Sequence, residues 1–324
     1  MDKCKTIFGI DISKNTFDVM DSNGKHSQFE NNSKGFPKFL KLLNSDSHCV
    51  MEATGYYHYQ LAHYLVENKI LVSVENPLSI KRFIQMKLLR IKTDKSDAKM
   101  ICQYGQEREL QPWVGYTKNQ MECFQLIRLL DTYTKQSTAY KNKLQAEQTL
   151  GNPSKDVVQS LKRSLKQLKK ESEIIEKILL KLVKEDHQEM LTHLLSIPSI
   201  GEKTAISLLV VTDGFTRFES AAQLISFCGL SPTTRQSGTS INGRSRISKV
   251  GNVKLRNLLF MGSLTACKHN PACKALYERI TNQGKSKKLA NIAVCNKLLK
   301  QAFAIAKSGV EYNKNHRSKL AIAN

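Results

Sequence analysis

Residues 6–20 read TIFGIDISKNTFDVM, and this stretch decides how the chain begins to fold. The apolar, β-rich runs at residues 6–12 and 16–20 each have the length of a strand, and the SKN between them is typical of a turn. We therefore predict two antiparallel strands joined by a short turn. A third short strand near residues 27–30 would complete a meander.

Helical and strand patterns alternate after this meander. We predict a helix at residues 35–43, a strand at 48–53, a helix at 58–68, a strand at 70–75 and a helix from Pro77 towards Leu89. Three antiparallel strands followed by alternating helices and strands indicate a mixed α/β sheet.

Four acidic residues of this part occupy positions that suit chemistry. Asp11 and Glu52 each lie near the carboxyl end of a predicted strand, where open α/β sheets place their active sites. Asp94 and Asp97 begin a helical pattern and are three residues apart, so both carboxylates share one helix face. Asp18 lies in mid-strand, and its place in the alternation predicts an outward face, so it is left out of this set.

Converging carboxylates repel one another unless cations lie among them. Mg²⁺ prefers oxygen ligands and keeps waters for a phosphate-bearing substrate, and two such ions can clamp the two oxygens exchanged at a phosphodiester. For Asp94 and Asp97 alone, a helix cap and a first-turn acid explain the pair equally well. The placement of all four acids together resembles the RNase H-like (RuvC-like) nuclease fold.

Two long helices are predicted at about residues 121–147 and 156–195, separated by a Gly-Asn-Pro break. The second carries a heptad seam formed by Val158, Leu161, Leu165, Leu168, Ile175, Leu179 and Leu182. We expect an antiparallel hairpin or coiled coil. Its seam closes either within the chain or against another subunit, and we favour the subunit contact because the first helix has the weaker apolar stripe. The cations of its outer face are solvated or follow a nucleic-acid backbone: Lys162, Arg163, Lys166, Lys169 and Lys170.

Residues 194–210, LLSIPSIGEKTAISLLV, resemble a helix-hairpin-helix, whose turn holds a phosphate without reading sequence. Many such turns carry glycine where this one has Ser199. Further helices are predicted at about residues 220–228, 251–268 and 290–306. This last part is therefore mainly helical.

Residues 230–256, LSPTTRQSGTSINGRSRISKVGNVKLR, are rich in hydroxyls, glycine and cations. No Asp or Glu occurs between Glu219 and Glu278, so the cations have no acidic neighbour in sequence. The basic residues are Arg235, Arg244, Arg246, Lys249, Lys254 and Arg256. The stretch either grips a nucleic-acid backbone or presents Ser237 to a phosphate as a nucleophile. Ser240, Ser245 and Ser248 are neighbouring alternatives.

The composition points to a polyanionic partner. Of 324 residues, 50 are Lys or Arg and 28 are Asp or Glu, which gives a formal net charge of +22. Nucleic acid is the usual partner of such a chain. No stretch approaches the roughly 18 apolar residues of a membrane span, and the eight cysteines form no CxxC pair. We therefore expect a cytoplasmic protein without a membrane segment, disulfide framework or zinc ribbon.

The order of the motifs GIDISK, MEATG, KTDKSDA, IPSIGEKTA, GLSPTTRQSG and SKVGNVKLR resembles transposases of the IS110 family and the related Piv-type DNA invertases. The resemblance covers nearly the whole chain. It implies a RuvC-like domain with a catalytic tetrad on Asp11, Glu52, Asp94 and Asp97, and a catalytic serine on Ser237. It also implies one composite site assembled between subunits of a dimer to tetramer, and guidance by a non-coding bridge RNA that pairs with target and donor DNA.

The expected domains are a RuvC-like catalytic domain at 1–115, a coiled-coil hairpin at 116–190, a transposase domain at 191–310 and a basic tail at 311–324. The expected function is Mg²⁺-dependent cleavage and rejoining of DNA strands by an insertion-sequence transposase. A Piv-type invertase, a metal-dependent RuvC-like nuclease that uses water, and a non-catalytic nucleic-acid-binding protein are the alternatives. The sequence leaves open the DNA target, the RNA, inversion against transposition, and whether Ser237 meets the carboxylates within one chain.

Overall fold

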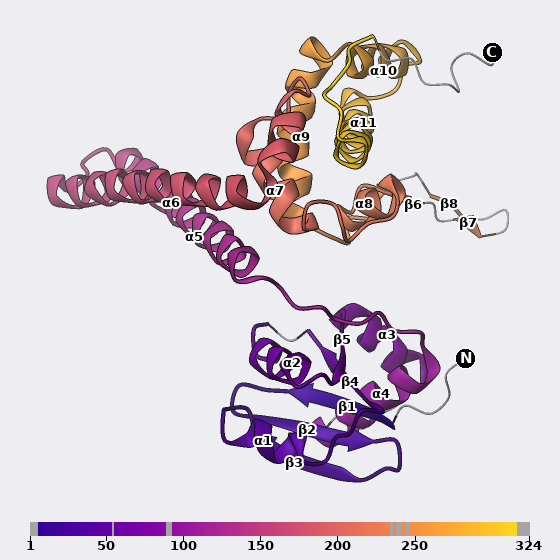
Figure 1. Cartoon of the computed structure of the whole chain (residues 1–324). Helices are drawn as coiled ribbons and strands as arrows, with labels where there is room; N and C mark the ends of the chain where they lie inside the picture. Colours follow the sequence, from indigo (N-terminus) through magenta and orange to yellow (C-terminus); the bar gives the residue numbers. More distant parts are fainter. Residues whose placement is uncertain are drawn as a thin grey trace, which may run out of the picture. The chain divides into compact units, whose positions relative to one another are not determined.

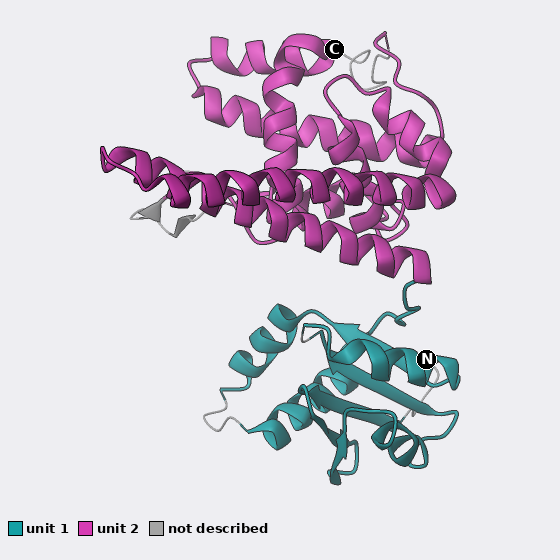
Figure 2. Ribbon diagram, turned by 90° about the vertical axis from the view of Figure 1, so that its left-hand side faces the viewer, with its two compact units in different colours: residues 1–116 teal, residues 117–324 magenta. Residues whose placement is uncertain are grey.

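The computed structural model describes residues 6–53, 55–88, 93–233, 236–237, 241–243 and 246–315, without the side chains of residues 236, 237, 241 and 242. The chain divides into two compact units, residues 1–116 and 117–324 (Figure 2). Unit 2 includes both the long helices and the C-terminal helices. Each unit is described by itself.

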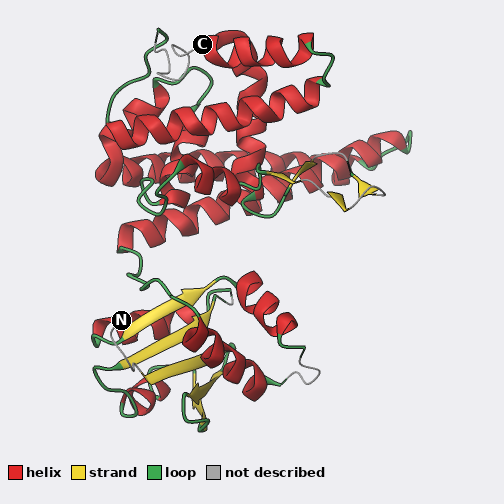
Figure 3. Ribbon diagram, turned by 90° about the vertical axis from the view of Figure 1, so that its right-hand side faces the viewer, coloured by secondary structure: helices red, strands yellow, loops and turns green. Residues whose placement is uncertain are grey.

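Unit 1 is built on a five-stranded sheet in the order β3-β2-β1-β4-β5 (Figures 1 and 3). The strands are β1 (Thr6–Ile12), β2 (Thr16–Asp21), β3 (His26–Glu30), β4 (Ser47–Glu52) and β5 (Leu71–Glu75). β1, β2 and β3 pair antiparallel, whereas β4 pairs parallel with both β1 and β5. The predicted meander and mixed sheet are confirmed.

Helices cover both faces of this sheet because successive strand residues point to opposite sides. The helices are α1 (Gly35–Leu40), α2 (His58–Glu67), α3 (Pro77–Met86) and α4 (Asp94–Glu107). α1 and α2 share a core with Phe8 and Ile10 of β1, and α3 and α4 share another with Ile7. Gly9 lets α4 approach closely, since an added Cβ would lie 2.1 Å from the main-chain nitrogen of Cys102.

Unit 2 begins with two long helices, α5 (Lys118–Thr149) and α6 (Lys155–Leu195), which lie side by side (Figure 1). The predicted hairpin is therefore confirmed, and α5 packs along the heptad seam of α6 within the chain. Leu179 and Val183 are buried, whereas the seam towards Val158 is only half-buried. A kink at His187, which has non-helical dihedral angles, separates this arm from the rest of α6. A contact with a second subunit stays a prediction.

The C-terminal helices share one core with the end of α6. They are α7 (Glu202–Thr212), α8 (Ala221–Phe227), α9 (Val253–His269), α10 (Pro271–Asn282) and α11 (Lys287–Ser308). The turn from α6 to α7 holds Ser199 at φ +80°, a conformation that favours glycine and explains why glycine is common in such turns. α10 is not among the helices expected from the sequence, although Leu276, Tyr277 and Ile280 follow a helical spacing.

The basic stretch, expected to be a loop, contains two short antiparallel pairs. β6 (Pro232–Thr233) pairs with β9 (Arg246–Ile247), and β7 (Gln236–Ser237) pairs with β8 (Ile241–Asn242). Where the structure describes it, the stretch therefore contains paired short strands. Across the described residues, no helix combines the length and apolarity that a membrane span requires.

Candidate active site

The first two predicted acids lie on neighbouring strands. Ile10 and Met51 are partners in the parallel pairing of β1 with β4, and Asp11 and Glu52 are the next residues on each strand. Both acids therefore lie at the carboxyl edge of the sheet. Their alternation with Gly9 places them on the face that α4 covers.

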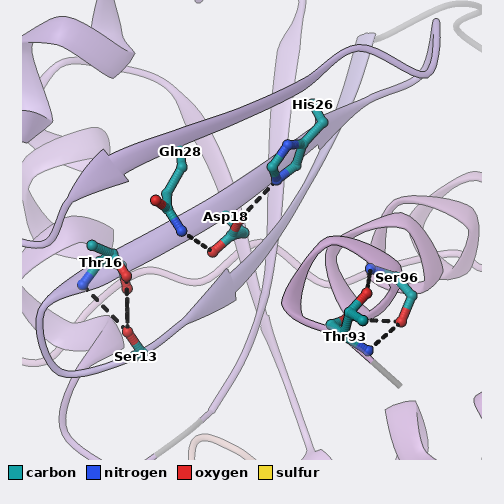
Figure 4. A network of polar contacts seen from close by, with 7 residues as sticks. All are labelled: Ser13, Thr16, Asp18, His26, Gln28, Thr93 and Ser96. Carbon is teal, nitrogen blue, oxygen red and sulfur yellow. Dashed lines mark hydrogen bonds and ion pairs between the residues drawn. The ribbon is translucent and has the colours of Figure 1, made fainter. Parts of the chain in front are cut away.

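The other two acids lie in the first turn of α4. Thr93 is the N-cap of this helix: its hydroxyl accepts a hydrogen bond from the Ser96 amide at 3.1 Å, and the Ser96 hydroxyl accepts one from the Thr93 amide at 2.8 Å (Figure 4). The alternative interpretation of Asp94 as the cap is therefore wrong. Asp94 and Asp97 do lie in the first turn of α4, where negative charge stabilises a helix, as the alternative interpretation expects.

The negative charges of the other three acids act on Asp11. The pKa of Asp11 rises from 3.8 to about 6, first because Asp11 is partly buried and then because of the negative charges of Asp97, Asp94, Glu52 and Asp18, in that order. Repulsion of this kind requires the charges to lie near one another. The structure thus brings together the four acids that the sequence places on two strands and one helix.

Asp18 corrects the sequence-based prediction of an outward face. Its side chain is buried, with 5% of its surface exposed. Its carboxylate receives a hydrogen bond from Gln28 Nε2 at 3.0 Å and pairs with His26 Nε2 at 2.7 Å (Figure 4). Asp18 is also the cross-strand partner of Asp11, so both point to the α4 face.

The sequence contained a signal for this fifth acid. The short turn between β1 and β2 sets the register, and counting back from the Ile12 and Phe17 pair brings Asp11 opposite Asp18. An alternation counted along β2 alone does not give this result, because it does not say which face of the meander a helix covers.

The chemistry of the cluster suits a hard divalent cation. Carboxylate oxygens are the ligands that Mg²⁺ prefers, and a cation would relieve the repulsion that raises the pKa of Asp11. Within the part of the chain that the structure describes, no three His, Cys, Asp or Glu side chains are close enough to hold a metal ion as they stand. The acids are therefore close enough to raise the pKa of Asp11 but too far apart to bind one ion together. Metal binding would require their side chains to move closer to one another.

Ser237 lies on β7, and its backbone is paired with Ile241 on β8. Its side chain is outside the described residues, as are Arg235 and Arg244 entirely. Arg246 on β9 and Lys249 are exposed. Ser237 belongs to unit 2, whereas the carboxylates belong to unit 1.

Two of the predicted DNA-binding cations have partners within the chain. Lys254 Nζ lies 2.6 Å from Asp131 Oδ1 of α5, so this cation, which has no acidic neighbour in sequence, has an acidic partner in space. Arg256 donates from Nη1 to the carbonyl oxygen of Cys228 at 2.8 Å. Sequence distance hid the ion pair, because Asp131 lies far from the basic stretch along the chain. Both cations stabilise the packing of α9, whereas Arg246 and Lys249 face solvent.

Comparisons with known proteins agree with the motif order. A family model described as "Transposase IS116/IS110/IS902 family" matches residues 191–278, and an IS110 model described as "Transposase" matches residues 8–150. The "Pilin gene-inverting protein" of Moraxella bovis is 30% identical over 321 residues, which are 96% of this chain and 98% of that protein. Its counterpart in Moraxella lacunata has the same identity and coverage.

A shorter similarity links the chain to a protein of an insertion element. The "Insertion element IS110 uncharacterized 43.6 kDa protein" of Streptomyces coelicolor is 34% identical over 119 residues, which are 37% of this chain and 29% of that protein. The full-length similarity and the two family matches lead to one conclusion. This chain belongs to the IS110 family of transposases.

Proposed function

We propose that this transposase cleaves and rejoins DNA strands through Asp11, Glu52, Asp94 and Asp97 as metal-binding carboxylates and Ser237 as the nucleophile. The observation that carries the proposal is the placement of these carboxylates: two lie at the carboxyl edge of β1 and β4, and two share the first turn of α4, which covers the same face. The sheet order and the acids at the carboxyl edge of β1 and β4 support an RNase H-like (RuvC-like) fold for unit 1. The family implies dependence on a divalent metal, and we propose Mg²⁺.

A bound ion would supply stabilisation of the negative charge that develops on the phosphate. The bond that forms joins Ser237 Oγ to phosphorus, while the bond from phosphorus to one DNA oxygen breaks. The serine gives up its proton, and the departing DNA oxygen takes one up as a hydroxyl. A hydroxyl of another strand then attacks the phosphoserine, which restores the serine and rejoins the DNA. Because each step exchanges one phosphoester bond for another, no external energy source is required.

The remaining cations of the basic stretch hold the DNA backbone in this proposal. Arg246 and Lys249 are exposed, and Arg235 and Arg244 join them by their place in the sequence. Each guanidinium can donate two hydrogen bonds to a phosphate. We assign no direct DNA contact to Lys254 or Arg256, because both already bind within unit 2.

The site needs two parts of the protein, because Ser237 and the carboxylates belong to different units. We propose a dimer to tetramer that joins through the α5–α6 arm and allows the serine of one copy to complete the carboxylate site of another. We also propose the finer domain division into residues 1–115, 116–190, 191–310 and 311–324, because the kink at His187 separates the α5–α6 arm from the C-terminal helices. The high positive charge is compatible with a bridge RNA that pairs with target and donor DNA.

The test is a denaturing-gel assay for a covalent protein–DNA adduct. It uses full-length protein, Mg²⁺, junction DNA of the element and RNA transcribed from its flanking non-coding region, with and without that RNA. We expect an RNA-dependent adduct that Ser237→Ala abolishes while DNA binding persists, with Ser248→Ala as the matched control. Cleaved ends without an adduct would support the nuclease that uses water. An adduct that survives Ser237→Ala would exclude this serine as the nucleophile.

DNA inversion is the second candidate outcome. It is favoured by the full-length similarity to proteins named for inverting a pilin gene. A plasmid that carries the element's two junctions in inverted orientation tests it. Recovery of the inverted segment would indicate inversion, and insertion of the element at a new site would indicate transposition.

A further inference from the structure

Two exposed tyrosines follow the strand that carries Glu52. Tyr56 is 53% exposed and Tyr57 is 44% exposed, and both lie in the loop between β4 and α2. Exposed neighbouring aromatic rings are uncommon on a surface that meets only water, since each ring carries a large apolar area. They follow the carboxyl end of β4, four and five residues beyond Glu52.

A hydrogen-bonded bridge connects this loop to the strand that carries Asp11. Asn31 Nδ2 donates to the carbonyl oxygen of Tyr57 at 3.2 Å and to the carbonyl oxygen of Ser13 at 2.8 Å. Ser13 is two residues from Asp11, so the tyrosine loop and the end of β1 are held together. Lys14, in the same turn as Ser13, is exposed and adds positive charge to this edge.

An aromatic layer supports Tyr56 from behind. The ring centroid of Tyr59 lies 6.3 Å from that of Tyr56, 6.2 Å from that of Trp113 and 6.0 Å from that of Tyr116. Trp113 is in turn tied to the sheet, because its backbone amide donates to the carbonyl oxygen of Val72 at 2.7 Å. The exposed ring therefore rests on a packed base instead of moving alone in solvent.

We propose that Tyr56 and Tyr57 form a stacking platform for an unpaired nucleobase next to the phosphate that the carboxylates receive. Every base has an apolar π-face, so an aromatic platform binds a single strand without reading its sequence. The nearby Lys14 favours a nucleic acid over an apolar protein segment, because the phosphates that flank the base are anionic. This inference rests on the proposed function, since it assumes that DNA reaches Asp11 and Glu52.

The test uses single-stranded oligonucleotides of the element's junction sequence with 2-aminopurine at successive positions. The fluorescence of this base analogue falls when it stacks, so titration with the full-length protein in Ca²⁺ without turnover reports stacking at each position. We expect quenching at one or two adjacent positions. Tyr56→Leu with Tyr57→Leu should remove the quenching and weaken binding roughly tenfold, as expected for the loss of base stacking.

Two further variants separate stacking from a general structural effect. Tyr56→Phe with Tyr57→Phe keeps the π-faces and should restore both quenching and affinity. Met86→Ala, which removes a 58%-exposed apolar side chain from α3 of the same unit, should behave as the wild type. Quenching that persists in the leucine variant, or that the phenylalanine variant does not restore, would overturn the platform.

The quenching experiment and the adduct assay test the platform and the proposed function separately. A wild-type adduct through Ser237 without position-specific quenching would overturn the platform and leave the proposed function intact. Position-specific quenching that depends on the two tyrosines, in a protein that forms no adduct and cuts no DNA, would support the platform and reject the catalytic proposal.

Discussion

Replacing Asp11 with asparagine should stabilise unit 1 above pH 6 while removing a proposed catalytic group. The pKa of Asp11 is raised from 3.8 to about 6 in the folded chain, so the folded state binds this proton more tightly than the unfolded state. The contribution of Asp11 to the free energy of unfolding is therefore largest at low pH and is lost as pH rises from about 4 to about 6. Asparagine does not ionise, so the variant avoids this loss.

The magnitude follows from the size of the pKa shift. About two pKa units correspond to about 3 kcal/mol in the absence of screening. Because Asp11 is only partly buried, solvent screening reduces the expected gain in the free energy of unfolding to about 1–2 kcal/mol above pH 6. The gain should be close to zero at pH 4.

Urea unfolding between pH 4 and pH 8 in the presence of EDTA measures this difference. Trp113, the single tryptophan of the chain, lies in unit 1 against its core and reports on that unit alone. Asp46→Asn, on an exposed turn of the same unit, is the matched control and should show no such pH dependence. If Asp11→Asn raised the free energy of unfolding equally at pH 4 and pH 8, or not at all at pH 8, the raised pKa of Asp11 would be refuted.

Three further predictions concern packing, DNA contact and metal. Gly9→Ala should lower the free energy of unfolding of unit 1 by about 3 kcal/mol, measured by Trp113 fluorescence, because its Cβ meets the backbone of Cys102; an unchanged midpoint would contradict the close approach of α4. Lys254→Ala should cost about 0.5–1 kcal/mol by loss of the half-exposed pair with Asp131 and leave the salt dependence of DNA affinity unchanged. Arg246→Ala should lower the slope of log DNA affinity against log salt concentration by about one and leave the free energy of unfolding unchanged. If Lys254→Ala lowered this slope and Arg246→Ala lowered the free energy of unfolding, the two roles would be exchanged. EDTA should abolish the protein–DNA adduct but spare DNA binding, and an adduct formed in EDTA would exclude a metal-dependent step.

Secondary structure was largely predictable from local patterns. The alternating runs on either side of the SKN turn predict β1 and β2, and the heptad spacing of α6 predicts the long hairpin. These patterns are local, because a strand or helix repeats its buried positions every few residues. α10 was missed although its apolar residues repeat at helical spacing and Pro271 follows the Asn270 cap, so the local signal was present.

Assignments that depend on distant partners were less predictable. Asp18 was expected on the outward face, but its burial beside His26 and Gln28 depends on how α4 covers the meander. Lys254 was expected to bind a nucleic acid, but it forms an ion pair with Asp131 of α5. The covering helix α4 and Asp131 both come from segments that lie far from these residues along the chain.

The sequence by itself determined the order of the elements, the strand-end and helix-start positions of the four acids, and the motif order by which the family is identified. Tertiary structure decided which distant segments meet: that α4 covers the face of the sheet that carries Asp18, and that Asp131 of α5 pairs with Lys254. The physical reason is that hydrophobic periodicity is read along the chain, whereas electrostatic and hydrogen-bond energies depend on distances in space between segments far apart in sequence.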